Sequence, residues 1–490
     1  MDFFLGRPEY KYELENICRL FFPSEKINPA PKPESSELCA SVEFSECEGQ
    51  TVITCKATAF SKKSEKKAVL PIVSDAYEKR LELAAARALY GAFSELCDFS
   101  PAWGILTGVR PAKLFCSFAE DVGTDEACSI FKNEYLVDGK KIELCKASAD
   151  AEKKAKSKSF GNSFSLYISI PFCPSRCHYC SFVSHSVANA GKLVPKYVEL
   201  LTEEIKKTAE VAKKIGLRLS TVYFGGGTPT QLSAAQLETI LSQIEQSFDL
   251  SQVAEYTVEA GRPDTVTKEK LDTLKRHGVG RISINPQTLD DRVLQNIGRK
   301  HTVDDFYKAY DIAKSVGFDT INTDLIAGLS GDTAEGFLKS VEGIIDLSPE
   351  NITVHTLAMK RSSSYVENGA AVYSAESKTA SEMVEKSTLL LQNAGFSPYY
   401  LYRQSKCLGN LENVGWSREG HDCLYNIYMM NELHTVLAVG AGAVSRLKAP
   451  SGNHIERIFN FKYPYEYINR FEEILKRKDT AGDFYEKFPF

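Results

Sequence analysis

Three cysteines lie within eight residues of one another, in the stretch IPFCPSRCHYCSF. Cys173, Cys177 and Cys180 follow a C-x3-C-x2-C spacing with no fourth cysteine nearby. A structural zinc site needs four ligands, and either His178 or His185 could complete a Cys3His set. Three thiolates alone suit an iron–sulfur cluster better, because one iron is then left free to bind a small molecule. The spacing therefore predicts a cluster with an open iron, and the zinc site is the alternative.

The remaining cysteines are scattered singly. The chain holds thirteen cysteines, an odd number, and its start MDFFLGRPEYKYE lacks the basic and long apolar regions of an export signal. We therefore expect a reducing, cytoplasmic compartment, in which clustered cysteines hold metal or do redox chemistry. The scattered thiols are expected to be small apolar fillers or incidental. They are Cys18, Cys39, Cys47, Cys55, Cys97, Cys116, Cys128, Cys145, Cys407 and Cys423.

Length and charge exclude several classes of protein. A chain of 490 residues is too long for one ordinary domain and suits two or three. The net charge of −5 argues against a general nucleic-acid binder. The apolar run TVLAVGAGAV covers ten residues, too few to span a bilayer. We expect a monomer with no nucleic-acid partner and no membrane span.

The elements that must position the cysteines are short apolar runs that alternate with helical patterns. Six strand–helix units of this kind predict a parallel sheet with right-handed crossovers, either an open doubly wound sheet or a partial (β/α) barrel. The cysteine loop follows the first run, where sites of α/β folds gather at the carboxyl ends of strands. The predicted strands are 166–172, 221–227, 255–261, 281–287, 320–329 and 351–358.

The rest of the chain is divided by composition. Residues 1–155 are predicted to form an N-terminal accessory α+β domain that ends in the charged linker DAEKKAKSKSFGN. This domain contains a helical pattern at 75–96. Residues 160–370 are the predicted core, and residues 371–490 a C-terminal mixed α/β domain that begins with a helix near 376–394.

The cysteine loop CPSRCHYC resembles that of radical S-adenosylmethionine (SAM) enzymes, with an aromatic residue before the last cysteine. The resemblance implies that the free iron chelates the amino and carboxylate groups of SAM. It also implies that an electron from the reduced cluster breaks a carbon–sulfur bond and yields a 5′-deoxyadenosyl radical. The protein must then bind and orient SAM and the substrate, and it must exclude water from the site.

The later strand ends should carry a SAM pocket if this resemblance holds. Gly226 and Gly227 in FGGGTPT let backbone N–H groups approach a carboxylate or amine, although a plain tight turn is the alternative. Glu259 could bind ribose hydroxyls or the SAM ammonium, or be an exposed loop acid. Gln287 could likewise be a satisfied loop amide.

Two charged residues follow on later strands. Asp324 lies in an otherwise apolar strand, where a carboxylate is costly unless it is paired or bound to a ligand. Arg299 in NIGRKHT could simply pair with Asp324, which is the alternative to a binding role for both. Ala358 ends the sixth run.

The motifs LYISIPFCPSRCHYCSF, FGGGTPT, VEAGRPD, RISINPQTLDD, IGRKHT and DLIAGL together resemble the oxygen-independent coproporphyrinogen III oxidase family. The coproporphyrinogen dehydrogenase (HemZ-like) branch is the nearer one. The likeness covers about 160–450, and WGILTGVRP in the N-terminal extension also resembles this branch. The family implies a partial (β/α)6 barrel.

The resemblance also implies roles for individual residues. Cys173, Cys177 and Cys180 would ligate a [4Fe–4S] cluster. Contacts to the cluster-bound SAM would come from Tyr167, Gly226 and Glu259. A second SAM would be surrounded by Tyr179, Gly227, Thr228, Gln287, Arg299, Asp324 and Ala358.

The implied reaction is an oxidative decarboxylation in haem biosynthesis that needs no oxygen. Two propionates of coproporphyrinogen III become vinyl groups, giving protoporphyrinogen IX and carbon dioxide. An electron donor such as flavodoxin or ferredoxin is implied, whereas the final electron acceptor is not named by the sequence. The tetracarboxylate substrate needs cationic side chains. Candidates, with plain surface charge as the alternative, are Arg262, Lys360, Arg361 and Arg403.

Two departures from the family patterns keep other functions open. The oxidase branch tends to carry a further cysteine where this chain has Phe182. The haem-chaperone branch carries His-Asn-x-x-Tyr-Trp before a Gly-Ala-Gly stretch, whereas this chain has YNIYMM, in which Tyr425 and Asn426 are most simply packing residues. His421 and His434 are nearby and could still bind haem. The alternatives are therefore a haem-binding trafficking chaperone, a radical SAM enzyme with another substrate, and a non-catalytic zinc scaffold.

Overall fold

The computed structural model describes the chain except for residues 24, 32–36, 73–75, 181–183, 359–370 and 405–406. The chain divides into two compact units. The first unit combines Met1–Lys146, Gly369–Lys378 and Tyr402–Glu412. The second unit combines Ala147–Asn368, Thr379–Leu401 and Asn413–Phe490. The compact units thus follow other boundaries than the segments 1–155, 160–370 and 371–490, whose status as domains stays a prediction.

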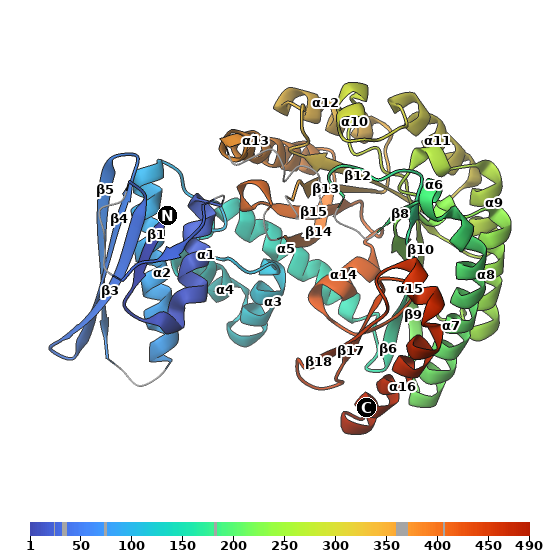
Figure 1. Cartoon of the computed structure of the whole chain (residues 1–490), viewed down its shortest axis with the longest axis horizontal. Helices are drawn as coiled ribbons and strands as arrows, with labels where there is room; N and C mark the ends of the chain where they lie inside the picture. Colours follow the sequence, from blue (N-terminus) through green and yellow to red (C-terminus); the bar gives the residue numbers. More distant parts are fainter. Residues whose placement is uncertain (24, 32–36, 73–75, 181–183, 359–370, 405–406) are drawn as a thin grey trace. The chain divides into compact units, whose positions relative to one another are not determined.

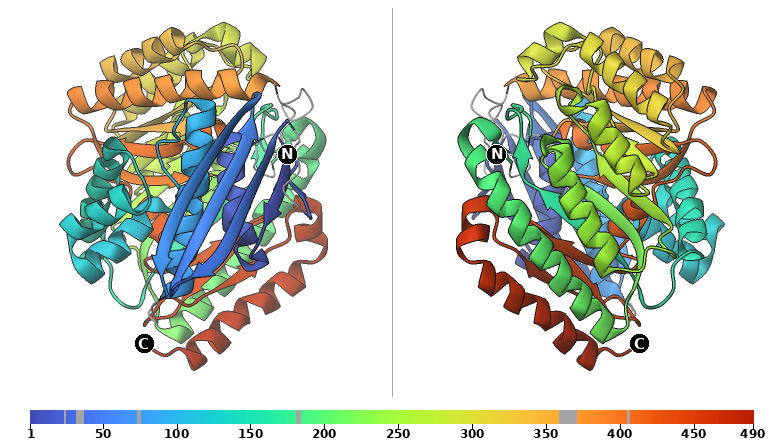
Figure 2. Two further views of the ribbon diagram at one scale, coloured as in Figure 1. Left: turned by 90° about the vertical axis from the view of Figure 1, so that its left-hand side faces the viewer. Right: turned by 90° about the vertical axis from the view of Figure 1, so that its right-hand side faces the viewer.

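The first unit is built on a five-stranded sheet in the order β2-β1-β3-β4-β5. Residues of β4 alternate between buried and more exposed positions, so that Ile53, Cys55 and Ala57 point to one face. Helices α1 and α2 cover that face, as Figures 1 and 2 show, and α2 contributes Leu81 and Leu89 to the shared core. The strands are β1 (Asp2–Leu5), β2 (Asn28–Pro29), β3 (Cys39–Cys47), β4 (Gln50–Ala59) and β5 (Lys62–Pro71). The helices are α1 (Lys11–Phe21), α2 (Tyr77–Cys97), α3 (Pro111–Val122), α4 (Thr124–Asn133) and α5 (Gly139–Lys156), which runs past the boundary of the unit.

The second unit is built on an eleven-stranded sheet in the order β14-β15-β13-β12-β11-β10-β9-β6-β16-β17-β18. Within this order, the strands from β13 to β16 pair with one another in parallel. The parallel α/β sheet predicted from the sequence is therefore confirmed, and the pairings of the described strands run in open order from β14 to β18. The parallel strands are β6 (Ser163–Ile170), β9 (Arg218–Gly226), β10 (Glu255–Glu259), β11 (Arg281–Ser283), β12 (Thr320–Ala327), β13 (Asn351–Thr356) and β16 (Thr435–Val439). The other strands are β14 (Ser397–Arg403), β15 (Glu412–Ser417), β17 (Val444–Lys448) and β18 (Ile455–Phe459), and antiparallel pairs join β15 to β13, β17 to β16 and β18 to β17.

Helices follow the parallel strands and lie outside the sheet, as the green and yellow segments of Figures 1 and 2 show. Capping residues determine where several of these helices begin and end. Ser233 and Thr302 form capping boxes that start α8 and α11, and Gly216 and Gly317 end α7 and α11 with φ of 83° and 79°. The helices are α6 (Val187–Ala190), α7 (Val194–Ile215), α8 (Ala234–Ser247), α9 (Lys268–Arg276), α10 (Asp291–Asn296), α11 (Val303–Val316), α12 (Ala334–Asp346), α13 (Ala371–Asn393), α14 (Leu424–Asn431), α15 (Pro464–Asn469) and α16 (Phe471–Lys487).

A buried carboxylate of α7 ties the C-terminal elements to the sheet. Glu204 Oε2 accepts hydrogen bonds from Gly440 N (2.7 Å) and Tyr467 Oη (2.6 Å). Its Oε1 accepts from Asn460 Nδ2 (2.6 Å) and lies 2.7 Å from Lys478 Nζ. These contacts hold the turn after β16 and the helix α16 against α7.

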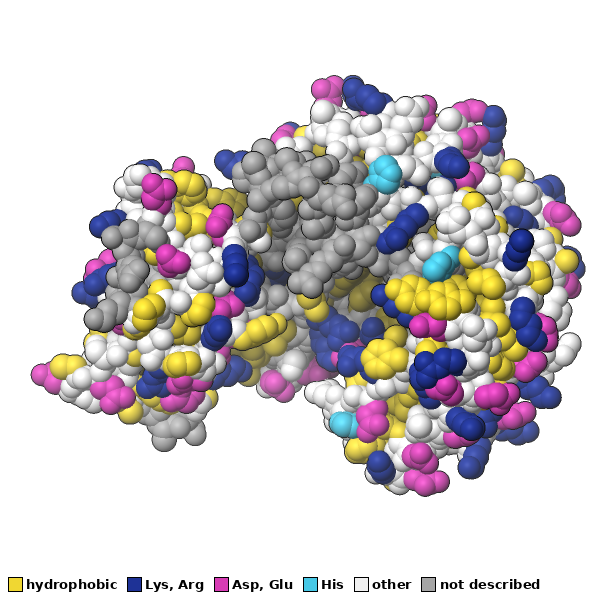
Figure 3. Space-filling model, viewed as in Figure 1, with side chains coloured by type: hydrophobic (Ala, Val, Ile, Leu, Met, Phe, Trp, Pro, Cys, Tyr) yellow, Lys and Arg dark blue, Asp and Glu magenta, His cyan; other side chains and the backbone are white. Residues whose placement is uncertain are grey.

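The distribution of charged side chains on the surface and the polarity of the helices are as expected from the ordinary composition. Basic and acidic side chains are intermixed over the visible face of the second unit (Figure 3), as expected for a small net charge. Every helix of the described residues is too short or too polar to cross a membrane.

Candidate functional site

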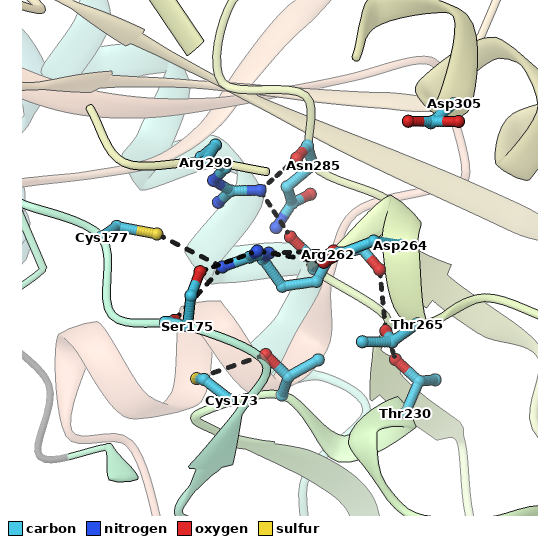
Figure 4. Close-up of polar contacts among 12 residues, drawn as sticks. Cys173, Ser175, Cys177, Thr230, Arg262, Asp264, Thr265, Asn285, Arg299 and Asp305 are labelled. Carbon is cyan, nitrogen blue, oxygen red and sulfur yellow. Dashed lines mark hydrogen bonds and ion pairs between the residues drawn. The ribbon is translucent and has the colours of Figure 1, made fainter. Parts of the chain in front are cut away.

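The cysteine loop follows β6 and is contacted by two other strand ends. Cys173 and Cys177 are buried, and Cys180 is partly exposed. Thr228, after β9, donates a hydrogen bond from its hydroxyl to Cys173 Sγ at 3.4 Å. Arg262, after β10, places Nη1 3.5 Å from Cys177 Sγ (Figure 4). Two of the three sulfurs therefore already have hydrogen-bond donors, as metal-bound thiolates commonly do.

One histidine of the zinc alternative, His178, is held by another group, whereas Nε2 of His185 is buried with no hydrogen-bond partner among the described residues. His178 Nδ1 lies 3.0 Å from Asn296 O, and its ring packs so closely on Gly298 that a Cβ there would lie 2.9 Å from Nε2. His185 meets the ring of Tyr463 edge-on at 5.7 Å. Among the described residues, no group of three or more His, Cys, Asp or Glu side chains is arranged to hold a metal ion.

The glycine turn after β9 packs directly against the cysteine loop. Gly226 has φ of +104°, a conformation that other residues rarely adopt. Gly227 N donates to Ile170 O at 2.8 Å, and a Cβ on Gly227 would lie 2.8 Å from Phe172 O and 3.0 Å from Cys173 Sγ. The close approach is more than a plain tight βα turn requires.

Glu259 ends β10 as a half-buried carboxyl. Tyr223 Oη donates a hydrogen bond to Glu259 Oε1 at 2.6 Å. Burial raises the pKa of Glu259 to about 7, although the Tyr223 hydrogen bond opposes this shift. The alternative of an exposed loop acid is therefore wrong. A cation bound here would restore the ionised form of the carboxyl.

Three tyrosine rings stack beside this carboxyl. The Tyr223 and Tyr425 ring centroids are 4.2 Å apart, and Tyr167 lies 6.2 Å from Tyr223 and 6.0 Å from Tyr425. Glu255 positions Tyr425 by accepting hydrogen bonds from Leu424 N (2.7 Å) and Tyr425 N (3.2 Å) at the start of α14. The buried ring of Tyr425 confirms a packing role for this residue.

Arg299 and Asp324 are joined through Asn285 and not to each other in the contacts of the described residues. Arg299 Nη1 donates to Gly261 O and Asn285 O, both at 3.0 Å, and Nη2 donates to Tyr179 Oη at 2.9 Å. Asn285 Nδ2 donates to Asp324 Oδ2 at 2.8 Å. The alternative of a simple Arg299–Asp324 pair is therefore wrong. Asn285 was missed in the sequence, although its place in SINPQ at a strand end was a usable signal.

Asp324 is stabilised as a carboxylate inside the sheet. Burial favours its protonated form, but His355, with Nε2 3.5 Å from Oδ2, and Asn322, with Nδ2 2.8 Å from Oδ1, lower its pKa below the usual value. Burial likewise opposes the charge of His355, but the contact with Asp324 raises the pKa of the imidazole. His355 is a second polar residue that sequence analysis did not single out.

Gln287 and Ala358 lie beyond the ends of their strands. Gln287 is buried and has φ of +73°, and its backbone bonds to β12 on both sides, through Asp324 O and Ile326 N, each at 3.0 Å. A left-handed, non-glycine residue of this kind is uncommon and marks many functional sites. Ala358 follows β13 by two residues. The structure thus places the cysteine loop, the glycine turn, Glu259, Gln287 and Ala358 at or after the carboxyl ends of adjacent parallel strands, whereas Tyr167 and Asp324 lie within β6 and β12 and Arg299 lies between α10 and α11.

The cations suggested for substrate binding have other surroundings than expected. Arg403, in the first unit, is 3% exposed and donates to Leu106 O (2.6 Å) and Asn410 O (3.2 Å). Arg262 is also 3% exposed. Plain surface charge is therefore the wrong description of both. Lys360 and Arg361 lie outside the described residues.

Comparison with known proteins places this site in a family. Residues 167–343 match the radical SAM superfamily. The chain is 38% identical over 380 residues to the oxygen-independent coproporphyrinogen-III oxidase-like protein HemZ of Bacillus subtilis, covering 77% of this chain and 76% of HemZ. It is 36% identical over 197 residues to the heme chaperone HemW of Bacillus subtilis, covering 40% of this chain and 51% of HemW.

A solved structure shares the fold. Coproporphyrinogen III oxidase (HemN) from Escherichia coli, a radical SAM enzyme, aligns with a TM-score of 0.52 at 20% identity, over 67% of this chain and 73% of that chain. Radical SAM proteins use a [4Fe–4S] cluster and SAM, so these two cofactors, predicted from the cysteine loop, are confirmed. The chain belongs to the radical SAM superfamily and, within it, to the family of oxygen-independent coproporphyrinogen III oxidase-like proteins.

Proposed function

We propose that the chain catalyses the oxygen-independent oxidative decarboxylation of coproporphyrinogen III to protoporphyrinogen IX. The name of its HemZ relative, an oxidase-like protein, supports this substrate. With the cluster and SAM bound, the site would supply a 5′-deoxyadenosyl radical, which can take hydrogen from a propionate β-carbon that no side-chain base deprotonates. The vinyl group would then form by loss of carbon dioxide and of one electron to an external one-electron acceptor. The chain's own residues then have to hold the cofactors and exclude water.

The proposed ligands of the cluster are Cys173, Cys177 and Cys180. The SAM on the open iron would be held by Tyr167, Gly226 and Glu259. The carboxyl of Glu259 and the stacked ring of Tyr167 both approach Gly225 of the glycine turn, because a Cβ on Gly225 would lie 3.2 Å from both side chains. This convergence of a carboxyl, an aromatic ring and a glycine turn next to the cysteine loop suits a cationic nucleoside.

A second SAM site remains a proposal with its own support. Arg299 binds Tyr179 and the backbone of two strand ends, and Asp324 is kept ionised. A cation that contacts the cysteine loop through Tyr179 and a carboxylate of β12 are thus linked through Asn285, which suits a zwitterionic amino-acid group. The remaining proposed contacts are Gly227, Thr228, Gln287 and Ala358.

Haem trafficking is the second candidate, because heme chaperones are also similar to the chain. The packing of Tyr425 is the observation that favours the enzyme. Where the chaperone pattern has a histidine, this chain buries a phenol ring against Tyr223. His434 is buried, with Nδ1 3.0 Å from Ser159 Oγ and Nε2 2.7 Å from Ser165 Oγ. His421 Nδ1 lies 2.8 Å from Thr320 Oγ1, so both nearby imidazoles are engaged elsewhere.

The test is anaerobic turnover by reconstituted protein with SAM, a reductant and coproporphyrinogen III. Protoporphyrinogen formed together with 5′-deoxyadenosine would support the proposal, and the Cys177→Ala variant should lose the brown chromophore and both products. Stoichiometric haem binding without turnover would instead establish the trafficking function. Cleavage of SAM without change to the porphyrinogen would point to another substrate. Comparing flavodoxin with ferredoxin as reductant in the same assay would identify the donor.

A further inference from the structure

Arg262 is a buried cation that lies against a proposed cluster ligand. We propose that its guanidinium donates a charge-assisted hydrogen bond to the Cys177 sulfur and raises the reduction potential of the cluster. The inference rests on the proposed ligand assignment of the three cysteines. It makes Arg262 a positioning residue that acts through Cys177, and not a substrate-binding residue.

The backbone of Arg262 is fixed by neighbouring strand ends. Arg262 O accepts hydrogen bonds from Thr265 N at 2.9 Å and Thr265 Oγ1 at 2.7 Å. Thr265 Oγ1 also lies 2.7 Å from Thr230 Oγ1, in the turn after β9 (Figure 4). Lys270 Nζ bridges the two segments by donating to Thr230 O (2.7 Å) and Thr265 O (3.0 Å). The backbone from which the Arg262 side chain extends is therefore held in place.

Every donor of the guanidinium has an acceptor. Nε and Nη2 bind the two oxygens of Asp264, each at 3.1 Å. Nη2 also donates to Ser175 Oγ at 3.2 Å, and Nη1 donates to Ser175 O at 3.3 Å and Cys177 Sγ at 3.5 Å. An arginine has five N–H groups, and these five contacts use all of them. None is left for a substrate propionate, whereas the sulfur is a direct partner.

The change in charge on reduction of the cluster determines the direction in which this contact shifts the reduction potential. Reduction adds negative charge to the cluster and its thiolates, and a cationic donor stabilises that charge. The effect is strong here because Arg262 is 3% exposed and little screened by water. Cys173 receives the neutral hydroxyl of Thr228 instead, so the two sulfurs differ in the charge of their donors. Asp264 offsets part of the Arg262 charge.

The experiment is a redox titration of the reconstituted full chain, followed by the electron paramagnetic resonance signal of the reduced cluster. At a poise where half of the wild-type cluster is reduced, Arg262→Gln should lower the ratio of reduced to oxidised cluster about tenfold, which equals about 59 mV for one electron. Arg262→Lys keeps the charge and should show a smaller fall. Asp264→Asn should shift the ratio the other way, because it removes the opposing charge. Arg276→Gln is the control, since Arg276 is 62% exposed and pairs with Glu238 on α8.

A purely structural role predicts a different pattern. If Arg262→Gln has normal iron content and the wild-type ratio of reduced to oxidised cluster, the inference is overturned. The proposed function would still stand if this variant turns over substrate. If Arg262→Gln assembles no cluster, the Asp264→Asn variant becomes the test. A raised ratio of reduced to oxidised cluster in Asp264→Asn supports the inference, and an unchanged ratio overturns it. Iron retained in full by Cys177→Ala would instead overturn the ligand assignment, and the inference with it.

Discussion

The phenol of Tyr223, on β9, donates a 2.6 Å hydrogen bond to Glu259 Oε1, at the end of β10. A carboxyl is thereby held inside the sheet by the neighbouring strand. Burial keeps it partly protonated near neutral pH, with a pKa of about 7. A positively charged ligand would shift it to the carboxylate, so this pair should govern the binding of SAM.

Tyr223→Phe should weaken the binding of SAM to the reconstituted protein about tenfold, because a hydrogen bond to an ionised group is worth about 1.5–3 kcal/mol. Calorimetric titration under anaerobic conditions measures the change. Tyr256→Phe is the matched control, since Tyr256 lies on β10 and its buried hydroxyl has no partner among the described residues. If Tyr223→Phe and Tyr256→Phe bind SAM with equal affinity, Tyr223 makes no contribution to the SAM site.

The affinity for SAM should also rise with pH through about 7, where Glu259 ionises. Because the folded pKa lies above the ordinary carboxyl value, the unliganded protein gains stability from protonated Glu259 at low pH and loses it as the pH rises through about 7. Glu259→Gln should abolish both dependences. Binding and thermal unfolding measured between pH 5.5 and 8.5 check this, and an unchanged pH profile in the variant would contradict the assignment.

Gly227→Ala should lose more than half of the bound iron. Its new Cβ would lie 2.8 Å from Phe172 O and 2.9 Å from Ile170 O, so the backbone of the cysteine loop must shift. Gly482→Ala on α16 is the control, because a Cβ there meets nothing within 4 Å and alanine favours the helix by about 1 kcal/mol. Iron and sulfide analysis after reconstitution compares the two; full occupancy in Gly227→Ala would show that the turn tolerates a side chain.

Arg403→Met should destabilise the first unit by about 3 kcal/mol, because it leaves buried carbonyl groups without their charged donor. Arg403 binds Leu106 O and lies 5.5 Å from the Trp103 ring. Thermal unfolding and limited proteolysis measure the loss. Arg87→Met, at an exposed site on α2, should leave stability unchanged. The KM for coproporphyrinogen III should stay at the wild-type value in soluble Arg403→Met; a large rise would return Arg403 to the list of substrate contacts.

Six strands of the parallel sheet were predictable because each is a short apolar run bounded by a helical pattern, whereas the seventh, β16 (Thr435–Val439), was missed although it lies in the apolar run TVLAVGAGAV. The run 351–358 became β13 (Asn351–Thr356), and 221–227 became part of β9 (Arg218–Gly226). The predicted strand 281–287 is shorter and ends at Ser283, because Pro286 has no N–H to donate to a strand ladder, and Gln287 returns to β12 only in an isolated bridge to Leu325. The strands of the first unit were missed; in β5 (Lys62–Pro71), for example, four of the first six residues are lysines, which hides the alternation typical of a strand.

The site could be predicted in part for the same reason. Residues at strand ends lie together whenever the sheet is parallel, which is why the cysteine loop, the glycine turn and Glu259 converge. Contacts that depend on how a long side chain reaches back across strands left no pattern in the sequence. Arg262 next to Cys177, and His355 next to Asp324, are of this kind.

The pairing of β6 with β16 has a consequence for how the protein matures. Phe164 lies opposite Thr435, so the strand that leads into the cysteine loop gains its second neighbour only when the ribosome has made most of the chain. Until then one edge of β6 exposes unpaired backbone groups, a surface on which nascent chains can aggregate. Growing cells should therefore depend on chaperones, or on slow translation, to keep this edge covered before the metal is inserted.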